Sequence, residues 1–121
     1  AISNGGSVTV TSGGTATLGR VDTGSFDGRG GNLTITAGGD VSLGDSLTFA
    51  LVGGDSGHVT ITAGGSVTLN NLDTSSDGGQ GGHVRLTVAG DVLGRGAIDT
   101  SAFGSGQGGD IIVQAGGNVH L

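Results

Sequence analysis

The chain has 121 residues, of which 30 are glycine, and it contains no proline, cysteine, methionine, tryptophan or tyrosine. Its formal net charge is −6 at pH 7 and it has only three Phe, which disfavours both nucleic-acid binding and docking on anionic membranes. No apolar run approaches the roughly 18 residues that span a bilayer, and the lack of cysteine excludes disulfides. All acidic residues are Asp and all basic residues are Arg. The absence of the helix formers Glu and Lys disfavours helices.

Similar segments recur along the whole chain. Five glycines, spaced 25, 26, 25 and 27 residues apart, each follow a short strand-like run: Gly14, Gly39, Gly65, Gly90 and Gly117. The residues around them are alike, as in GGSVTVTSGGTATL, GGNLTITAGGDVSL and SGHVTITAGGSVTL. A repeat of this length is too small to bury its own core, so the spacing predicts coils that stack on one another.

Each repeat opens with a segment in which apolar and polar residues alternate, at 8–11, 33–36, 59–62, 84–87 and 111–114. Successive side chains of a strand point to opposite faces, so the alternation predicts strands with one apolar face turned inward. The predicted inward columns are Val8, Leu33, Val59, Val84 and Ile111, and Val10, Ile35, Ile61, Leu86 and Val113. The outward columns are Thr9, Thr34, Thr60, Arg85 and Ile112, and Thr11, Thr36, Thr62, Thr87 and Gln114.

The rest of each repeat supplies a corner, two more sides and a closing loop. Gly-Gly or Ala-Gly pairs at 13–14, 38–39, 64–65, 89–90 and 116–117 allow the chain to turn. A polar residue able to bond the local turn backbone follows each corner: Thr15, Asp40, Ser66, Asp91 and Asn118. A second strand is predicted at 16–18, 41–43, 67–69, 92–93 and 119–121, and a third side at 21–23, 47–51, 72–74 and 98–100.

Three short strands per repeat predict an all-β fold, a right-handed parallel β-helix (β-solenoid) that forms a single domain over residues 1–121. It has about 4.5 coils of 25–27 residues. The right hand follows from the rule for parallel crossovers. The coils are expected at about 5–29, 30–55, 56–80 and 81–107, with a partial coil at 108–121.

The segment GGNLTITAGGDVSL, together with the third-side segment LDTSSDGGQGGH, resembles the repeats of filamentous-haemagglutinin-like exoproteins. These are large secreted bacterial adhesins, many of them exported by two-partner secretion, with relatives among cyanobacterial surface proteins. The resemblance covers residues 5–121. It implies a right-handed β-helix, an extracellular or cell-surface location, and a role in adhesion, biofilm or filament formation. The N-terminal secretion domain of such exoproteins does not occur in this sequence, so the resemblance leaves the export route open.

We therefore expect a structural or adhesive segment of a secreted bacterial surface protein or extracellular filament, and not an enzyme. Neither end of the predicted stack looks capped, and an open strand edge is a template for further strands. The expected partners are another copy stacked end to end, or flanking coils of a longer chain, with host or matrix glycans in addition. Nucleic-acid binding and membrane insertion are not expected.

His58 and His83 share one column just before the first strand, and Asp110 follows one coil later. Adjacent coils place such residues roughly 5 Å apart, and two histidines with a carboxylate are ligands for a transition metal. Ser7 and Asn32 occupy the same column in the other coils. The favoured interpretation is therefore a solvent-facing polar column.

A column of aspartates, Asp22, Asp73 and Asp99, with Asp27 and Asp77 in the loops, raises the question of Ca²⁺ binding. The tandem nine-residue period of calcium-binding β-helix repeats is absent, and aspartate is also a common turn former. The sequence assigns no catalytic, cofactor-binding or metal-ligating residue. A Ca²⁺- or glycan-binding module is the alternative function.

Two further activities fit only parts of the sequence. The ladder of Thr9, Thr34 and Thr60 beside Thr11, Thr36 and Thr62 resembles the flat face of ice-binding β-solenoids, but Arg85, Ile112 and Gln114 interrupt it. A carbohydrate-active β-helix enzyme needs a groove with inserted loops and, in general, aromatic residues for sugar stacking. The short loops and the absence of Tyr and Trp disfavour such an enzyme.

Overall fold

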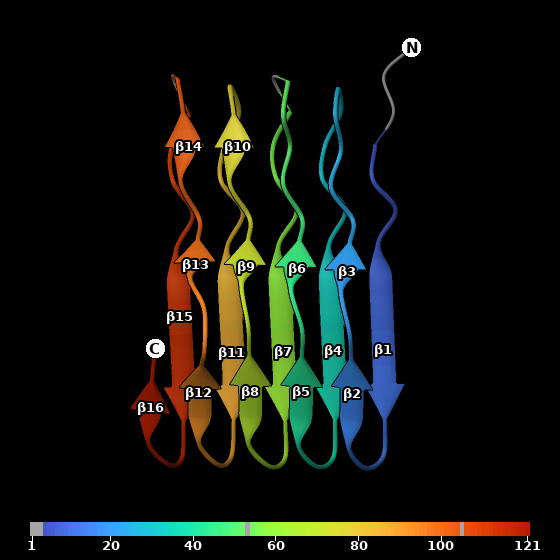
Figure 1. Ribbon diagram of the computed structural model, residues 1–121, viewed down its shortest axis with the longest axis vertical. Helices are drawn as coiled ribbons and strands as arrows, with labels where there is room; N and C mark the ends of the chain where they lie inside the picture. The colour runs from blue at the N-terminus through green and yellow to red at the C-terminus, as the bar shows by residue number, and fades with distance from the viewer. Residues whose placement is uncertain (1–3, 53, 105) are drawn as a thin grey trace.

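The computed structural model describes residues 4–52, 54–104 and 106–121. Over these residues the chain is a β-solenoid of about four turns, with parallel strands and no helix. The predicted fold class is therefore confirmed. The coils stack side by side along the axis of the solenoid (Figure 1).

Equivalent strands of successive coils pair into four sheets, named here A to D. Sheet A contains β1 (Val8–Ser12), β4 (Leu33–Ala37), β7 (Val59–Ala63), β11 (Val84–Val88) and β15 (Ile111–Ala115). Sheet B contains β2 (Ala16–Leu18), β5 (Val41–Leu43), β8 (Val67–Leu69), β12 (Val92–Gly94) and β16 (Val119–His120). Sheet C contains β3 (Val21–Asp22), β6 (Ser46–Leu47), β9 (Leu72–Asp73) and β13 (Ile98–Asp99), and sheet D contains β10 (Ser76–Asp77) and β14 (Ala102–Phe103).

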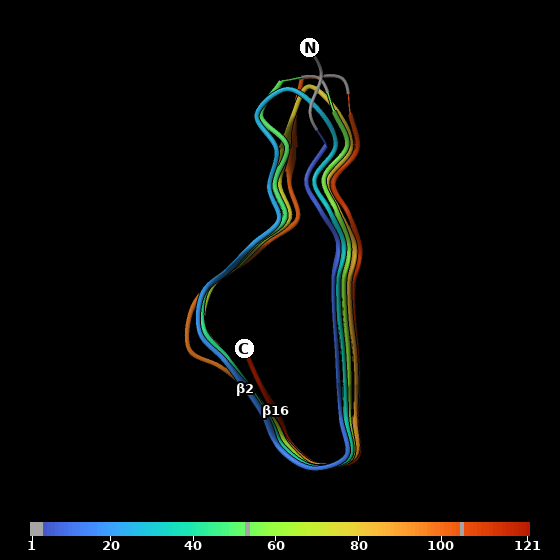
Figure 2. The same cartoon turned by 90° about the vertical axis from the view of Figure 1, so that its right-hand side faces the viewer.

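The strands pair in the register that the repeat predicts. Ile35 lies opposite Ile61, and Ile61 lies opposite Leu86, so one column continues through the stack. Viewed along the axis, sheet A forms one long straight wall, and sheets B and C return along the other side (Figure 2). With sheet A on the far side, its strands run downward while the coils advance from N to C, so the winding is right-handed (Figure 1).

The core fills the wide part of the coil, and its composition follows the alternation along sheets A and B. Leu33, Ile35 and Ile61 are fully buried, as are Val84 and Leu86, which confirms the two predicted inward columns in the inner coils. A third inward column, of small or short residues at the end of each sheet A strand, adds Ala37, Ala63 and Val88. At the last coil, Ile111 occupies the same inward column but is 44% exposed.

Beyond sheet C the two walls of each coil approach each other, and the coil becomes a narrow neck (Figure 2). In the second coil the buried Thr48 Oγ1 donates a hydrogen bond to the Gly57 carbonyl oxygen at 2.9 Å, and the Gly57 N–H donates to the Thr48 carbonyl oxygen at 2.8 Å. The same pairing recurs in the other coils as Thr23–Gly31, Thr74–Gly82 and Thr100–Gly109. A threonine–glycine clasp therefore closes every coil.

Sheet D lies at the tip of this neck and was not predicted. The sequence indicates three strands per coil followed by a glycine-rich loop, whereas β10 and β14 form a fourth parallel pair there. Ser25, Ala50 and Ser76 extend the pairing as isolated bridges. Because a clasp closes successive coils at the equivalent place, the tips of these coils overlie one another and their backbones can pair.

Ser46 is the one residue of sheet C whose buried side chain does not suit its surroundings. It aligns with Val21 and Leu72 in an inward column, is 1% exposed, and its Oγ has no hydrogen-bond partner among the described residues. A buried hydroxyl without a partner costs about 1–3 kcal/mol. We therefore expect Ser46→Val to raise the free energy of unfolding by about 1 kcal/mol. Urea denaturation measures this change, and a loss of stability would contradict the expectation.

Candidate functional site

Polar side chains at one corner of the solenoid form a ladder from coil to coil. Asp40 Oδ1 accepts a hydrogen bond from the Ser66 N–H at 2.8 Å, and Ser66 Oγ accepts from the Asp91 N–H at 3.1 Å. Asp91 Oδ1 in turn accepts from the Asn118 N–H at 2.8 Å. The sequence indicates residue types able to bond their own turn, whereas these three side chains accept hydrogen bonds from the following coil.

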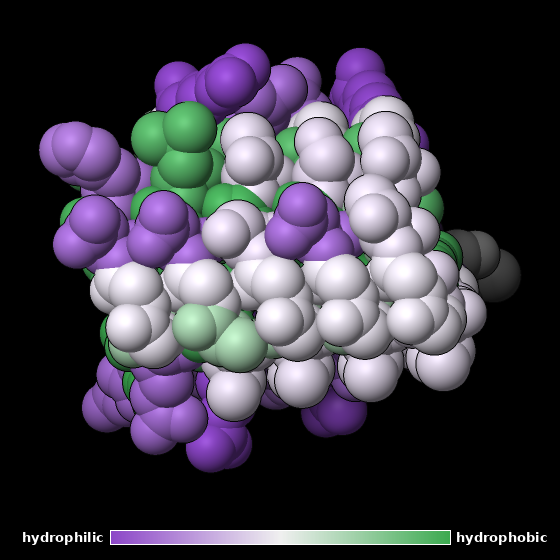
Figure 3. All heavy atoms as spheres, turned by 90° about the horizontal axis from the view of Figure 1, so that it is seen from below, coloured by the Kyte–Doolittle hydropathy of each residue, from purple (hydrophilic) through white to green (hydrophobic). Residues whose placement is uncertain are grey.

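The surface of this corner is formed by small residues. Seen from below, it is a band of small, nearly neutral residues, bordered by a broken row of hydrophilic side chains (Figure 3). A Cβ on Gly38 or Gly64 would lie 2.4 Å or 2.3 Å from the carbonyl oxygen of the equivalent glycine one coil before. The band is therefore glycine-rich because the coils pack backbone to backbone there.

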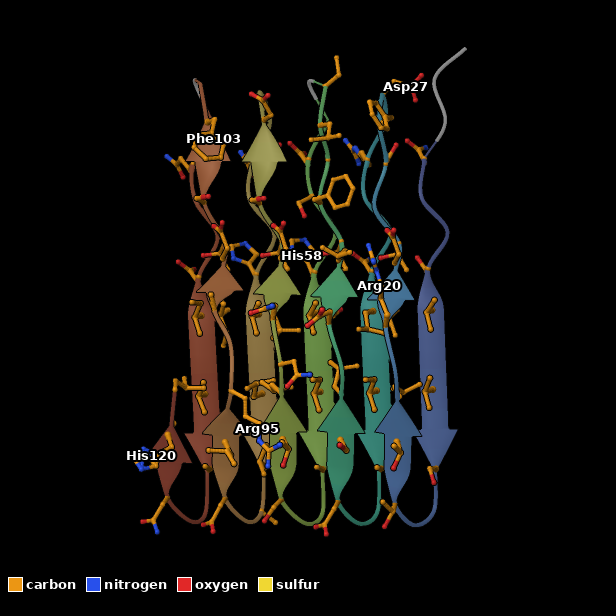
Figure 4. All side chains as sticks on the ribbon, in the orientation of Figure 1. Arg20, Asp27, His58, Arg95, Phe103 and His120 are labelled. Atoms are coloured by element: carbon orange, nitrogen blue, oxygen red, sulfur yellow. The ribbon has the colours of Figure 1, made fainter. Side chains whose placement is uncertain are left out.

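The predicted column of His58, His83 and Asp110 is present on the outer surface where sheet A begins; Figure 4 labels His58. The two imidazole rings stack with their centroids 5.0 Å apart and their planes inclined by 10°. His83 Nδ1 lies 3.9 Å from Asp110 Oδ2. Burial lowers the pKa of His58 below 6.5, the neighbouring His83 lowers it further, and Asp55 opposes the change.

This column is built for hydrogen bonding between coils, and its geometry does not favour a shared metal ion. His58 Nδ1 accepts from the His83 N–H at 2.9 Å, and His83 Nδ1 accepts from the Asp110 N–H at 2.8 Å. Both Nδ1 lone pairs are thus engaged, and parallel rings do not direct their remaining nitrogens at one point. Among the described residues, no three His, Cys, Asp or Glu side chains form a group able to hold a metal.

The aspartate column lies along sheet C and serves as turn structure. Asp22 Oδ1 accepts from the Gly24 N–H at 3.0 Å, and Asp73 Oδ1 and Asp99 Oδ1 accept in the same way from the N–H groups of Ser75 and Ser101. Hydrogen bonds from Ser101 lower the pKa of Asp99. Leu47 occupies the equivalent place in the second coil, so the carboxylates do not form a continuous row. Of the two loop aspartates, Asp77 lies in β10 and Asp27 lies outside the named strands.

A shallow groove of about 400 Å³ crosses four coils beside this column. It is lined by residues of sheet C and of the segment before it: Arg20, Asp45, Leu47, Asn71, Leu72, Asp73, Ala97 and Asp99. The polar residues on its floor again bond neighbouring coils, since Asp45 Oδ1 accepts from the Asn71 N–H and Asn71 Oδ1 accepts from the Ala97 N–H. The groove thus exposes polar side chains whose orientation is fixed by the backbone.

The threonine ladder also forms as predicted on the outer face of sheet A. Thr9, Thr34 and Thr60 lie in register, and so do Thr11, Thr36 and Thr62. Thr87 continues the second row, but Arg85 and Ile112 replace threonine in the first row in the last two coils. The hydroxyl array is therefore confined to one part of the face.

Comparisons with known protein families, with curated proteins and with solved structures gave no match. Across the part of the chain that the structure describes, no helix has the length and apolar character needed to cross a membrane.

Proposed function

We propose that this chain is a rigid segment of an extracellular rod or filament on a bacterial surface, which lengthens when a further coil stacks on its end. The observation that carries the proposal is the difference between inner and outer coils. Val92 is 1% exposed, whereas its column neighbour Val119 in the last coil is 47% exposed. A further coil, from another copy or from the same polypeptide, would bury this surface as the inner coils bury theirs.

The polar ladders support the same proposal. In the inner coils, Asp40, Ser66 and Asp91 each accept an N–H from the following coil. Asn118 continues this column in the last coil and also carries a side-chain oxygen that can accept a hydrogen bond. The ladder therefore gives the stack a direction, since each side-chain acceptor bonds an N–H of the coil that follows it. The resemblance of the repeats to those of secreted adhesins supports a location outside the cell.

The glycine columns offer a direct test of end-to-end stacking. A Cβ on Gly6 or Gly13 meets nothing within 4 Å, whereas a Cβ on Gly31 or Gly38, one coil later, would lie 2.3 Å or 2.4 Å from a backbone oxygen. We expect the unmodified chain to associate into rods with rising concentration. Gly6→Ala/Gly13→Ala should fold equally well but associate at least about tenfold more weakly, because the added methyl groups obstruct an incoming coil.

Sedimentation velocity across a concentration series, followed by electron microscopy, measures this association. Circular dichroism and the Tm at low concentration check that the double variant keeps the fold. Monomers at every concentration of the unmodified chain would overturn stacking between copies. Equal association of the double variant would overturn stacking through the face that carries Gly6 and Gly13.

A further inference from the structure

One polar column joins four consecutive coils through hydrogen bonds from a backbone N–H to a side chain of the preceding coil. Asn32 Oδ1 accepts from the His58 N–H at 2.8 Å. His58 Nδ1 accepts from the His83 N–H at 2.9 Å, and His83 Nδ1 accepts from the Asp110 N–H at 2.8 Å. The two histidines thus perform at their junctions the role that asparagine performs at the junction before them.

These contacts select one tautomer for each neutral ring. A backbone N–H can only donate, so each Nδ1 must carry a lone pair, and the single proton of each neutral ring must lie on Nε2. The rings are also stacked, with 5.0 Å between their centroids. Two charged rings at this distance repel each other, so the column is arranged for two neutral histidines.

We propose that this column makes the stack of coils sensitive to pH, because protonation of His58 turns an acceptor for the next coil into a donor. The backbone N–H of His83 then loses its partner, and a positive charge lies against the neighbouring ring. The junction that weakens is the one between the third and fourth coils. The junction at Asn32 has no titrating acceptor and stays unchanged.

The charged groups around the two rings are Asp55, Asp110 and Arg85. Asp110 Oδ2 lies 3.9 Å from His83 Nδ1. Arg85 follows His83 by two residues on the same outward face. For His58 the pKa is lowered below 6.5 by burial and by His83, and only Asp55 opposes this.

The direction of the effect follows from the lowered pKa of His58. The unfolded chain binds this proton at a higher pH than the folded chain does. The contribution of neutral His58 to the free energy of unfolding is therefore complete above about pH 6.5. It is lost as the pH falls through the pKa of His58 in the folded chain.

The chain offers its own control, since asparagine already occupies this column at residue 32. The test is urea denaturation at pH 7.5 and at pH 5.0. Both values lie above the range in which aspartates titrate, near pH 3.9. For the unmodified chain we expect the unfolding constant to rise by more than about twofold between these two values. The variant His58→Asn/His83→Asn should keep the ladder and change by less than about twofold, whereas His120→Asn should respond like the unmodified chain.

An equal pH response in the double variant would overturn the proposal, and so would a flat response of the unmodified chain. If the double variant does not fold, nitrogen NMR of the unmodified chain decides. At pH 7.5 both rings should carry their proton on Nε2, and a proton on either Nδ1 would contradict the inference. On acidification the amide of His83 should lose hydrogen-exchange protection, with the His58 amide, bonded to Asn32, as the internal reference.

Discussion

Replacing Gly57 by alanine is expected to lower the free energy of unfolding by about 3 kcal/mol, which corresponds to a fall of about 10 °C in Tm. A Cβ on Gly57 would lie 2.0 Å from the carbonyl oxygen of Gly31 and 2.9 Å from that of Gly30, both in the neck of the coil. These obstacles are backbone atoms, so they cannot rotate away as a flexible side chain would. Gly57 also forms the clasp with Thr48, so any shift that relieves the clash weakens those two hydrogen bonds.

Gly6 provides the matched control, because it occupies the same column in the first coil and a Cβ there meets nothing within 4 Å. Gly6→Ala should leave stability within about 0.5 kcal/mol, or raise it slightly, since alanine restricts the unfolded chain more than glycine does. Chemical denaturation of both variants at low concentration compares them directly. An equal loss in the two variants would show that the close approach of coils is not the cause.

The parts of this fold that the sequence predicts are those that depend on neighbours along one strand. Alternation in 33–36 and 59–62 predicts which side chains point inward, and Ile35 and Ile61 are indeed fully buried. The glycine corners set the register, because each corner must lie on the one before. Both patterns recur in every repeat, so five weak local signals predict the same inward face and the same register.

The parts that were missed depend on contacts across the coil or between coils. Thr48 is buried in the neck, although threonine on sheet A points outward, and only the approach of the opposite wall at Gly57 explains the difference. The burial of Ser46 was missed because the third side of the second coil is predicted to begin at residue 47, whereas β6 begins at Ser46. Asp40 and Asp91 are residue types able to bond their own turns, but their partners lie 26 and 27 residues further along the chain, where no local pattern points.

Truncation of Ile61 to alanine is expected to cost about 4 kcal/mol of unfolding free energy. Its side chain is fully buried at the centre of sheet A, between Ile35 and Leu86 in the same column. Removal of three carbons there leaves a cavity that the neighbouring coils cannot fill, because their backbones are fixed by hydrogen bonds on both sides. The measurement is urea denaturation with a check that the m-value is unchanged, so that the loss reports stability alone.

Truncation of Ile111 separates the effect of burial on stability from the effect of residue type. It also faces inward on sheet A, but it lies in the last coil and is 44% exposed. Ile111→Ala in dilute protein should therefore cost only about 1 kcal/mol, because half of the side chain is already in water. If stacking of a further coil buries that side chain, the cost should rise with protein concentration toward the value at Ile61. A cost at Ile111 that is independent of concentration, in a chain that does associate, would mean that copies meet through some other surface.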